Sequence, residues 1–371
     1  MVSNHGLSGL DEFPIHQAPL PIAFAASSDR NFYDRAYFNA HDRTGDIFAI
    51  FGHGYYPNLG TKDAFFMVRR GDEQTAVHLG DPVDDDRMNQ HVGAYRVEVT
   101  EPLQRVRVVL EETEGISADL TWDGSFPALQ EMPHVMRQGS RVTLDAQRFA
   151  QVGTWEGHIT IDGTEIPVTP DRWLGSRDRS WGIRPVGEAP PEGAPATPEF
   201  EGMWWLYVPM RFDDFMICLI VQEEPDGYRS MNDCHRVWKD GRIEQLGWPH
   251  VDVRYASGTR VPTGATITCT APDGKPVVVE VESLLPVPLH VGGGYGGDSD
   301  WTHGVWKGAG FTERLTYDMT APDVDGRVMF GVIDHVGRAT IDGQEGWGLF
   351  EHGSIGRHDP SGFADWFSLA P

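Results

Sequence analysis

An acidic residue surrounded by cations and indoles is the most distinctive chemical feature of the sequence. Residues 173–184 read WLGSRDRSWGIR, in which Asp178 stands between two arginines and close to Trp181 and Arg184. A neighbouring guanidinium keeps a carboxylate ionised and can stack on an indole ring, so the segment predicts an oriented polar cluster. We expect Asp178 to be catalytic, and Trp181 and Arg184 to bind substrate. The alternative is a structural Arg–Asp–Trp corner that closes a barrel.

A second candidate acid, Glu351, lies near the end of the chain in the run WGLFEH. In a strand, period-2 alternation places Trp347, Leu349 and Glu351 on one face, so a carboxyl group stands beside apolar neighbours. If that face is interior, loss of solvent raises the pKa of Glu351 and makes it a candidate proton donor. The alternative is a charged partner, Arg338 or Arg357, that keeps the carboxylate ionised and structural.

A glycine-rich segment carries the third catalytic candidate, His303. Residues 292–308 read GGGYGGDSDWTHGVWKG, but no helix pattern follows, so a phosphate-binding loop is not indicated. A flap that presents Trp301, His303 and Trp306 could use the imidazole as proton donor or acceptor, although a packed histidine is the alternative. Tyr317 follows in the next strand-like run, and we count Trp301, Trp306 and Tyr317 among the substrate-binding candidates.

Aromatic residues also open an apolar strand pattern after residue 201. The run GMWWLYVPM predicts a strand whose alternate side chains face opposite sides. Either Trp204 or Trp205, together with Tyr207, could line an apolar ligand pocket. Adjacent aromatics can equally place one ring in the core and one at an interface.

Composition and charge exclude several function classes. The 371 residues carry 30 Lys and Arg against 55 Asp and Glu, for a formal net charge of −25. Such a surface repels phosphate backbones and anionic lipids, so we predict no nucleic-acid partner and no integral membrane association. The first residues lack a basic start followed by an apolar run, and we therefore expect a cytoplasmic protein.

Metal and hydrolase motifs are missing from the sequence. There is no HExxH, no paired-cysteine ligand set and no GxSxG elbow, so we predict no metal, no cofactor and no serine hydrolase. The three cysteines lack CxxC spacing and are expected to be buried thiols: Cys218, Cys234 and Cys269.

The elements that must position these residues are strands. Short alternating β-branched and aromatic runs recur, for example at 95–99, 105–110 and 265–270, and Asp–Gly pairs such as 162–163 and 342–343 separate them. No window carries a sustained 3.6-residue apolar period, so helices should be few and short. We predict an all-β fold of two lipocalin-like antiparallel halves, each a barrel or sandwich.

Two halves are indicated by length, by a linker and by an internal echo. Residues 186–201 are rich in Pro, Gly and acid, which is typical of an exposed connection. We expect an N-terminal lipocalin-like domain over 1–190, a linker over 191–201 and a C-terminal lipocalin-like domain over 202–371. The runs HITIDGTE at 158–165 and RATIDGQE at 338–345 match at five of eight positions, which favours a duplicated half.

Three of these segments together resemble a known family. The run DRSWG from Asp178, the strand WWLY that ends at Tyr207, and the run GWGLFEHG around Glu351 are similar to the AttH-like and hydroxyneurosporene synthase (carotenoid 1,2-hydratase) superfamily. The resemblance implies two calycin-type barrels with a pocket for long isoprenoid or polyketide-like molecules, and hydratase or cyclase chemistry without metal or organic cofactor. It matches Asp178 and Trp181 to the Asp-x-x-Trp-Gly core, and Tyr207 and Glu351 to an aromatic and an acid of the strands.

Two departures point away from carotenoid hydration itself: Arg179 stands where that branch tends to have His, and Val208 and Pro209 stand where it places an acid. Our hypothesis is a cofactor-independent enzyme that hydrates, isomerises or cyclises a terpenoid or isoprenoid-like substrate by acid catalysis in an aromatic pocket. The first alternative is a carrier that binds a small lipophilic molecule without catalysis. The second is a structural or interaction protein whose cavities are filled by its own side chains. The oligomeric state stays open.

Overall fold

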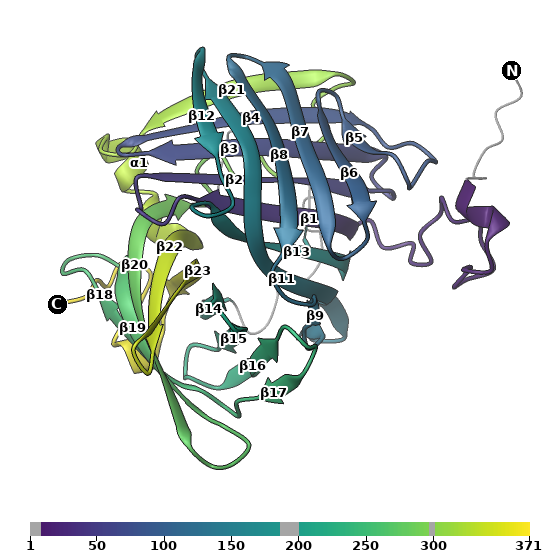
Figure 1. The fold of residues 1–371 in the computed structure, drawn as a ribbon. Helices are drawn as coiled ribbons and strands as arrows, with labels where there is room; N and C mark the ends of the chain where they lie inside the picture. The colour runs from purple at the N-terminus through teal and green to yellow at the C-terminus, as the bar shows by residue number, and fades with distance from the viewer. Residues whose placement is uncertain (1–8, 186–199, 297–300) are drawn as a thin grey trace, which may run out of the picture.

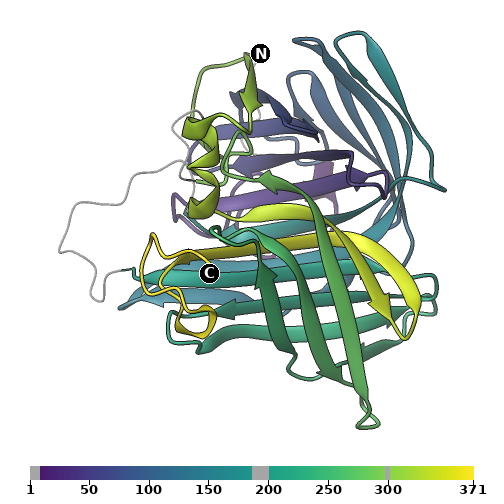
Figure 2. The ribbon, with the colours of Figure 1, turned by 90° about the vertical axis from the view of Figure 1, so that its left-hand side faces the viewer.

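The computed structural model describes residues 9–185, 200–296 and 301–371. Strands dominate it, and they form two curled antiparallel sheets that lie one above the other (Figure 1). Figure 2 shows the same two layers from the side. The all-β prediction with two antiparallel halves and few short helices is therefore confirmed.

The larger sheet contains fourteen strands of the described residues, in the order β21-β4-β3-β2-β1-β13-β11-β8-β7-β6-β5, with β9, β10 and β12 paired to β11. Its strands are β1 (Phe32–His41), β2 (Ile47–Tyr56), β3 (Thr61–Arg70), β4 (Glu73–Pro82), β5 (Gln90–Val92), β6 (Tyr95–Glu101), β7 (Arg105–Thr113), β8 (Ile116–Gly124), β9 (Leu129–Gln130), β10 (His134–Gln138), β11 (Arg141–Ile161), β12 (Thr164–Val168), β13 (Leu174–Ile183) and β21 (Phe311–Asp318).

The smaller sheet contains nine strands of the described residues, in the order β17-β16-β15-β14-β23-β22-β20-β19-β18. Its strands are β14 (Gly202–Arg211), β15 (Phe215–Glu223), β16 (Arg229–Trp238), β17 (Ile243–Gln245), β18 (His250–Tyr255), β19 (Pro262–Thr270), β20 (Pro276–Pro288), β22 (Ile333–Ile341) and β23 (Gln344–Gly356). The helical pieces of the same residues are short: η1 (Gly9–Glu12), α1 (Pro322–Asp325), η2 (Val328–Phe330) and η3 (Asp359–Ser361).

Three apolar clusters explain why the sheets curl and stack. One cluster, which includes Phe51 and Trp155, fills the inside of the larger sheet, and another, which includes Leu219 and Phe350, fills the inside of the smaller sheet. A third takes side chains from both sheets, among them Phe65 and Leu349, and holds the two layers together. Because strand side chains alternate between two faces, a strand such as β2 supplies the first and third clusters at once.

The two echoed runs are hairpin turns. Asp162 and Gly163 join β11 to β12, with φ angles of 48° and 77°, and Asp342 and Gly343 join β22 to β23, with φ angles of 49° and 80°. Two consecutive positive φ angles are what a two-residue turn between twisted strands requires, and Asp–Gly tolerates them. The local sequence thus predicted these hairpins correctly.

Strand β21 complicates a division of the chain by sequence. It lies in the second half of the sequence but pairs with β4 at the edge of the larger sheet, Thr316 opposite Thr75. Most of the predicted linker over 191–201 lies outside the described residues, and the two-domain boundary stays a prediction.

Among the described residues, no helix is both long and apolar enough to span a bilayer. The three cysteines are free and buried, as predicted.

Candidate active site

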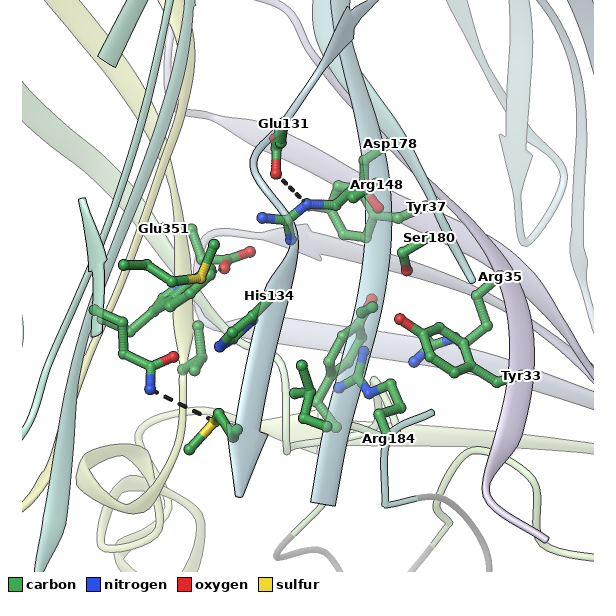
Figure 3. Close-up of a pocket in the computed structure, with 18 of the residues that line it drawn as sticks. Tyr33, Arg35, Tyr37, Glu131, His134, Arg148, Asp178, Ser180, Arg184 and Glu351 are labelled. Carbon is green, nitrogen blue, oxygen red and sulfur yellow. Dashed lines mark hydrogen bonds and ion pairs between the residues drawn. The ribbon is translucent and has the colours of Figure 1, made fainter. Parts of the chain in front are cut away.

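A cavity of about 220 Å³ lies between the two sheets and takes its walls from both (Figure 3). Its polar lining consists of Tyr33, Arg35, Tyr37, Glu131, His134, Arg148, Asp178, Ser180, Arg184, Gln222, Tyr295 and Glu351. Its apolar lining consists of Met132, Met136, Leu144, Ala146, Met203, Trp205, Met231, Leu289 and Val332. A concave cavity that combines apolar walls with convergent polar groups is typical of a small-molecule site.

Alternation in β1 and β13 supplies one wall. Tyr33, Arg35 and Tyr37 occupy every second position of β1, so they share the face toward the cavity. Strand β13 pairs with β1 and places Asp178 opposite Tyr37. Two neighbouring strands thus bring a phenol, a guanidinium and a carboxyl group to one surface.

Asp178 lines the cavity in a setting that favours its neutral form. Burial raises the pKa of Asp178 to about 7; the Arg148 charge opposes this shift, while Glu131 and Glu351 add to it. Among the described residues, the Asp178 carboxyl has no hydrogen-bond partner, so it faces the cavity with its proton available. A carboxylic acid with a pKa near neutrality is suited to general acid catalysis.

The expected pairing of Asp178 with the adjacent arginines is wrong. Arg177 donates from Nε to Gln151 Oε1 at 2.9 Å, and Arg179 donates from Nε to Asp34 Oδ1 at 2.9 Å. Both arginines are odd-numbered residues of β13, so alternation directs them to the face opposite Asp178. Without them the carboxyl group is not held in its ionised form, and its pKa shifts up instead of down.

Glu351 lines the cavity and belongs to a pair of buried carboxyl groups. It lies directly opposite Asp334 in the β22–β23 pair, and Trp205 donates from Nε1 to its Oε1 at 2.5 Å. Tyr37 donates its hydroxyl hydrogen to Asp334 Oδ2 at 2.5 Å. Burial, followed by the charge of Glu351, raises the pKa of Asp334 well above its usual range, and burial raises the pKa of Glu351.

The charged partners considered for Glu351 bind elsewhere. Arg338 contacts Glu345 at 2.6 Å, and Arg357 contacts Glu201 at 2.6 Å, both at the protein surface. As the alternation of β23 predicts, Glu351 faces inward with Leu349. The positive charge that most lowers the pKa of both Asp178 and Glu351 is that of Arg148, whose Nε donates to Glu131 Oε2 at 2.5 Å.

Arg148 also contacts the aromatic rings beside the cavity. Its Cζ lies 4.8 Å from the centroid of the Tyr207 ring and 5.8 Å from the centroid of Trp205. His134 stacks on Trp205 with 5.9 Å between ring centroids. Burial and the charge of Arg148 lower the pKa of His134 to about 4, so the imidazole is neutral at physiological pH.

Alternation in β14 separates the two adjacent tryptophans. Trp205 lines the cavity, and Tyr207 belongs to the same apolar cluster between the sheets. Trp204 points the other way into the core of the smaller sheet and donates to Tyr255 Oη at 3.2 Å. Of the two tryptophans, Trp205 is therefore the one placed to contact a ligand.

His303 and its flanking tryptophans lie apart from the cavity lining. His303 is buried behind Arg35, with 2.6 Å between its Nε2 and Arg35 Nη2, and burial lowers its pKa well below the usual range. Trp301 stacks on His78 at 4.3 Å between centroids, and Trp306 is 52% exposed.

Two further substrate-binding candidates also lie outside the cavity lining. Trp181 is an odd-numbered residue of β13 and is 37% exposed on the face away from Asp178. Tyr317 packs on β21 with Val291 and Met319. The structure thus brings four of the sequence candidates, Asp178, Arg184, Trp205 and Glu351, to the cavity, with Tyr207 adjoining them through Arg148.

Sequence reasoning missed several residues of the site. Asp334 could have been found, because counting back from the Asp342–Gly343 turn pairs residue 334 with residue 351. Nothing local marks Tyr37, Glu131 or Arg148, which come from strands or connections far from the family-like segments. The side chain of Arg148 reaches the cavity only because β11 lies next to β13 in the sheet.

The fold and the cavity define a class of protein: two stacked, curled β-sheets with a carboxyl-lined cavity between them. The chain belongs to the family described as a family of unknown function, DUF8625, which matches residues 7–364. No curated protein matches the sequence significantly.

Several solved structures are similar to this chain, and those with TM-scores of 0.50 or more share the fold. A protein of Nitrosomonas europaea described as AttH is 14% identical, covers 92% of this chain and 97% of its own, and has a TM-score of 0.55. CghA with Sch210972 is 14% identical, covers 87% of this chain and 88% of its own, and has a TM-score of 0.50. Kievitone hydratase of Nectria haematococca is 13% identical over 86% and 88% of the two chains, with a TM-score of 0.49. The AttH-like fold that the motifs imply is confirmed.

Proposed function

We propose that the protein is an enzyme that protonates a small apolar molecule in the cavity between its sheets, without an organic cofactor. The observation that carries the proposal is the convergence of two carboxyl groups with raised pKa, Asp178 and Glu351, on one cavity, with a third, Asp334, directly opposite Glu351 in the neighbouring strand. Burial of one such group is common in structural sites. Two that line one cavity, with a third paired to one of them, indicate an environment that favours the neutral acid, which is what alkene or enol protonation needs.

The proposed step starts at Asp178. Its carboxyl proton passes to a carbon of a substrate double bond, whose π electrons form the new C–H bond and leave a cation at the neighbouring carbon. The faces of Trp205 and Tyr37 border the cavity and stabilise that positive charge. Hydration follows when a water adds its oxygen to the cation and its proton returns to the Asp178 carboxylate, either directly or by relay through the protonated Glu351 carboxyl group, so that both acids end as they began. Isomerisation or cyclisation follows when a substrate C–H or C=C bond supplies the electrons instead.

The substrate class is a terpenoid, isoprenoid-like or related lipophilic molecule. Nine apolar residues line the cavity, four of them methionines: Met132, Met136, Met203 and Met231. Flexible thioether side chains adapt to irregular apolar shapes, so this wall suits a hydrocarbon skeleton. CghA, which shares the fold, has a structure with Sch210972. A cytoplasmic location remains the expectation from the sequence.

The test is deuterium transfer. Purified protein is incubated in D₂O with a panel of terpenoid polyenes, and products and recovered substrates are analysed by mass spectrometry. The wild type should place deuterium on carbon, and Asp178→Asn should abolish this while retaining the ligand. Asp252→Asn, a substitution on the exposed edge strand β18, serves as the matched control and should react as the wild type does. Deuterium transfer that persists in Asp178→Asn would contradict the assignment.

A carrier without catalysis is the second candidate. The methionine wall favours it, because ligand adaptation needs no proton donor. A carrier would bind a lipophile equally well as wild type and as Asp178→Asn, and neither protein would transfer deuterium. The two functions thus differ in one measurement.

A further inference from the structure

One cation of the cavity has no acidic partner. The Cζ of Arg184 lies 5.6 Å from the ring centroid of Tyr33 and 5.9 Å from that of Tyr295. Within residues 9–185, 200–296 and 301–371, its guanidinium forms neither a hydrogen bond nor an ion pair. Aromatic faces stabilise a guanidinium but leave its N–H donors unused.

A second guanidinium borders the same ring. The Cζ of Arg35 lies 4.8 Å from the Tyr295 centroid, and its Nη2 contacts His303 Nε2 at 2.6 Å. The lowered pKa of His303 makes it a neutral acceptor, so this contact does not neutralise Arg35. Arg35 Nε is buried and makes no hydrogen bond among the described residues. The carboxyl group beyond, that of Asp63, lies 3.5 Å from the far nitrogen of His303.

The third arginine that lines the cavity differs from these two because it has a direct acidic partner. Arg148 has Glu131 as a direct partner at 2.5 Å. Arg184 has none, although the chain carries 55 acidic residues against 30 basic ones. Because Arg184 is part-exposed and no side chain of the described residues engages its N–H donors, these donors stay available to a ligand in the cavity. The acidic surface does not attract anions, so any preference for one must come from the guanidinium groups that line the cavity.

We propose that Arg184 and Arg35 form an anion-binding end of the cavity, which holds a carboxylate or ionised enol group of an otherwise apolar substrate (Figure 3). The inference rests on the proposed function to the extent that the cavity receives a small molecule. Arg184 follows Asp178 by six residues along β13 and its end, a Cα separation of about 20 Å in an extended chain. The anionic group therefore anchors the substrate at a distance from the bond that is protonated, as remote binding groups do.

The test compares two probes of nearly the same shape, naphthalene-2-carboxylate and naphthalene-2-carboxamide, by isothermal titration calorimetry. Wild type should bind the carboxylate about tenfold more tightly than the amide, the value of one charge-assisted hydrogen bond. Arg184→Met keeps an unbranched apolar stem and removes the guanidinium charge. It should bring the carboxylate down to the affinity of the amide and leave the amide within about twofold of wild type.

Arg179→Met is the matched control, because it removes one positive charge from the same strand but on the opposite face. It should bind both probes as the wild type does. Equal affinities of the two probes for wild type, no binding of the carboxylate, or the same loss in Arg179→Met would overturn the proposal. Asp178→Asn separates the two proposals, since it should keep the carboxylate preference even though it loses deuterium transfer.

Discussion

Asp334 and Glu351 face each other across the β22–β23 hairpin, and each accepts a hydrogen bond from an aromatic side chain of a different strand. Tyr37, from the larger sheet, donates to Asp334, and Trp205, from the smaller sheet, donates to Glu351, both at 2.5 Å. Two opposed buried carboxyl groups cannot both ionise without strong repulsion. At neutral pH the pair therefore retains a proton next to the cavity.

Substitution of Glu351 by Gln should lower turnover but not binding. The amide keeps the size of the side chain and can still accept from Trp205, but it cannot exchange a proton. We expect kcat to fall about 100-fold, the typical contribution of a positioned acid or base, with KM nearly unchanged. Steady-state kinetics on the deuterium-labelled reaction measures this. A variant with wild-type kcat would show that Glu351 is structural.

Asp178 should make the protein less stable as pH rises from about 4 to about 7. The ordinary pKa of an aspartate is near 4 and that of folded Asp178 is about 7, so in this window the folded state binds more protons than the unfolded chain. The free energy of unfolding therefore falls with increasing pH and levels off above pH 7. Asp178→Asn should remove this destabilisation and be more stable than wild type by about 4 kcal/mol at pH 8, the value of a shift of about three pKa units.

Urea unfolding of both proteins at pH 5 and pH 8 measures this effect. Asp334 and Glu351 shift in the same direction and remain in the variant, so only the difference between the two proteins is informative. Identical pH dependence in wild type and Asp178→Asn would mean that Asp178 titrates near its ordinary pKa.

The Arg148–Glu131 pair should contribute strongly to stability, in contrast to exposed pairs. The Glu131 side chain is 3% exposed, so Arg148→Met leaves a buried carboxylate without its cation and should cost about 3 kcal/mol. Glu131→Gln in the Arg148→Met background should recover most of that loss. Arg105→Met breaks an exposed pair with Asp123 and should cost far less, because solvent screens the two charges. Additive effects of the two cavity substitutions would rule out the coupling.

Trp205→Phe should shift the pH profile of turnover upward. The indole N–H stabilises the ionised form of Glu351, so its removal raises the pKa of that carboxyl group. Trp204→Phe is the matched control, because Trp204 faces the opposite core and bonds to Tyr255. It should leave the pH profile unchanged, even if it lowers thermal stability. A profile unaffected by Trp205→Phe would exclude a role for this hydrogen bond in tuning Glu351.

Sequence alone determined the local features of this protein. Asp–Gly pairs require backbone angles that few other residues adopt, so they fixed hairpins such as the one at residues 342–343. Period-2 alternation correctly placed Glu351 with Leu349 and separated Trp204 from Trp205. These predictions succeed because turn geometry and strand pleat depend on neighbouring residues only.

Only the tertiary structure decided which faces meet. Alternation divides a strand into two faces but does not say whether a face lines the inside of one sheet or the space between two. Arg177 and Arg179 therefore looked like partners of Asp178, although they lie on the opposite face. Tyr37 and Arg148 reach the cavity through the pairing of β1 and β11 with β13, whose partners are far away in the sequence. Burial between the two sheets then raises the pKa of Asp178, a shift that requires the complete fold because it comes from excluded solvent.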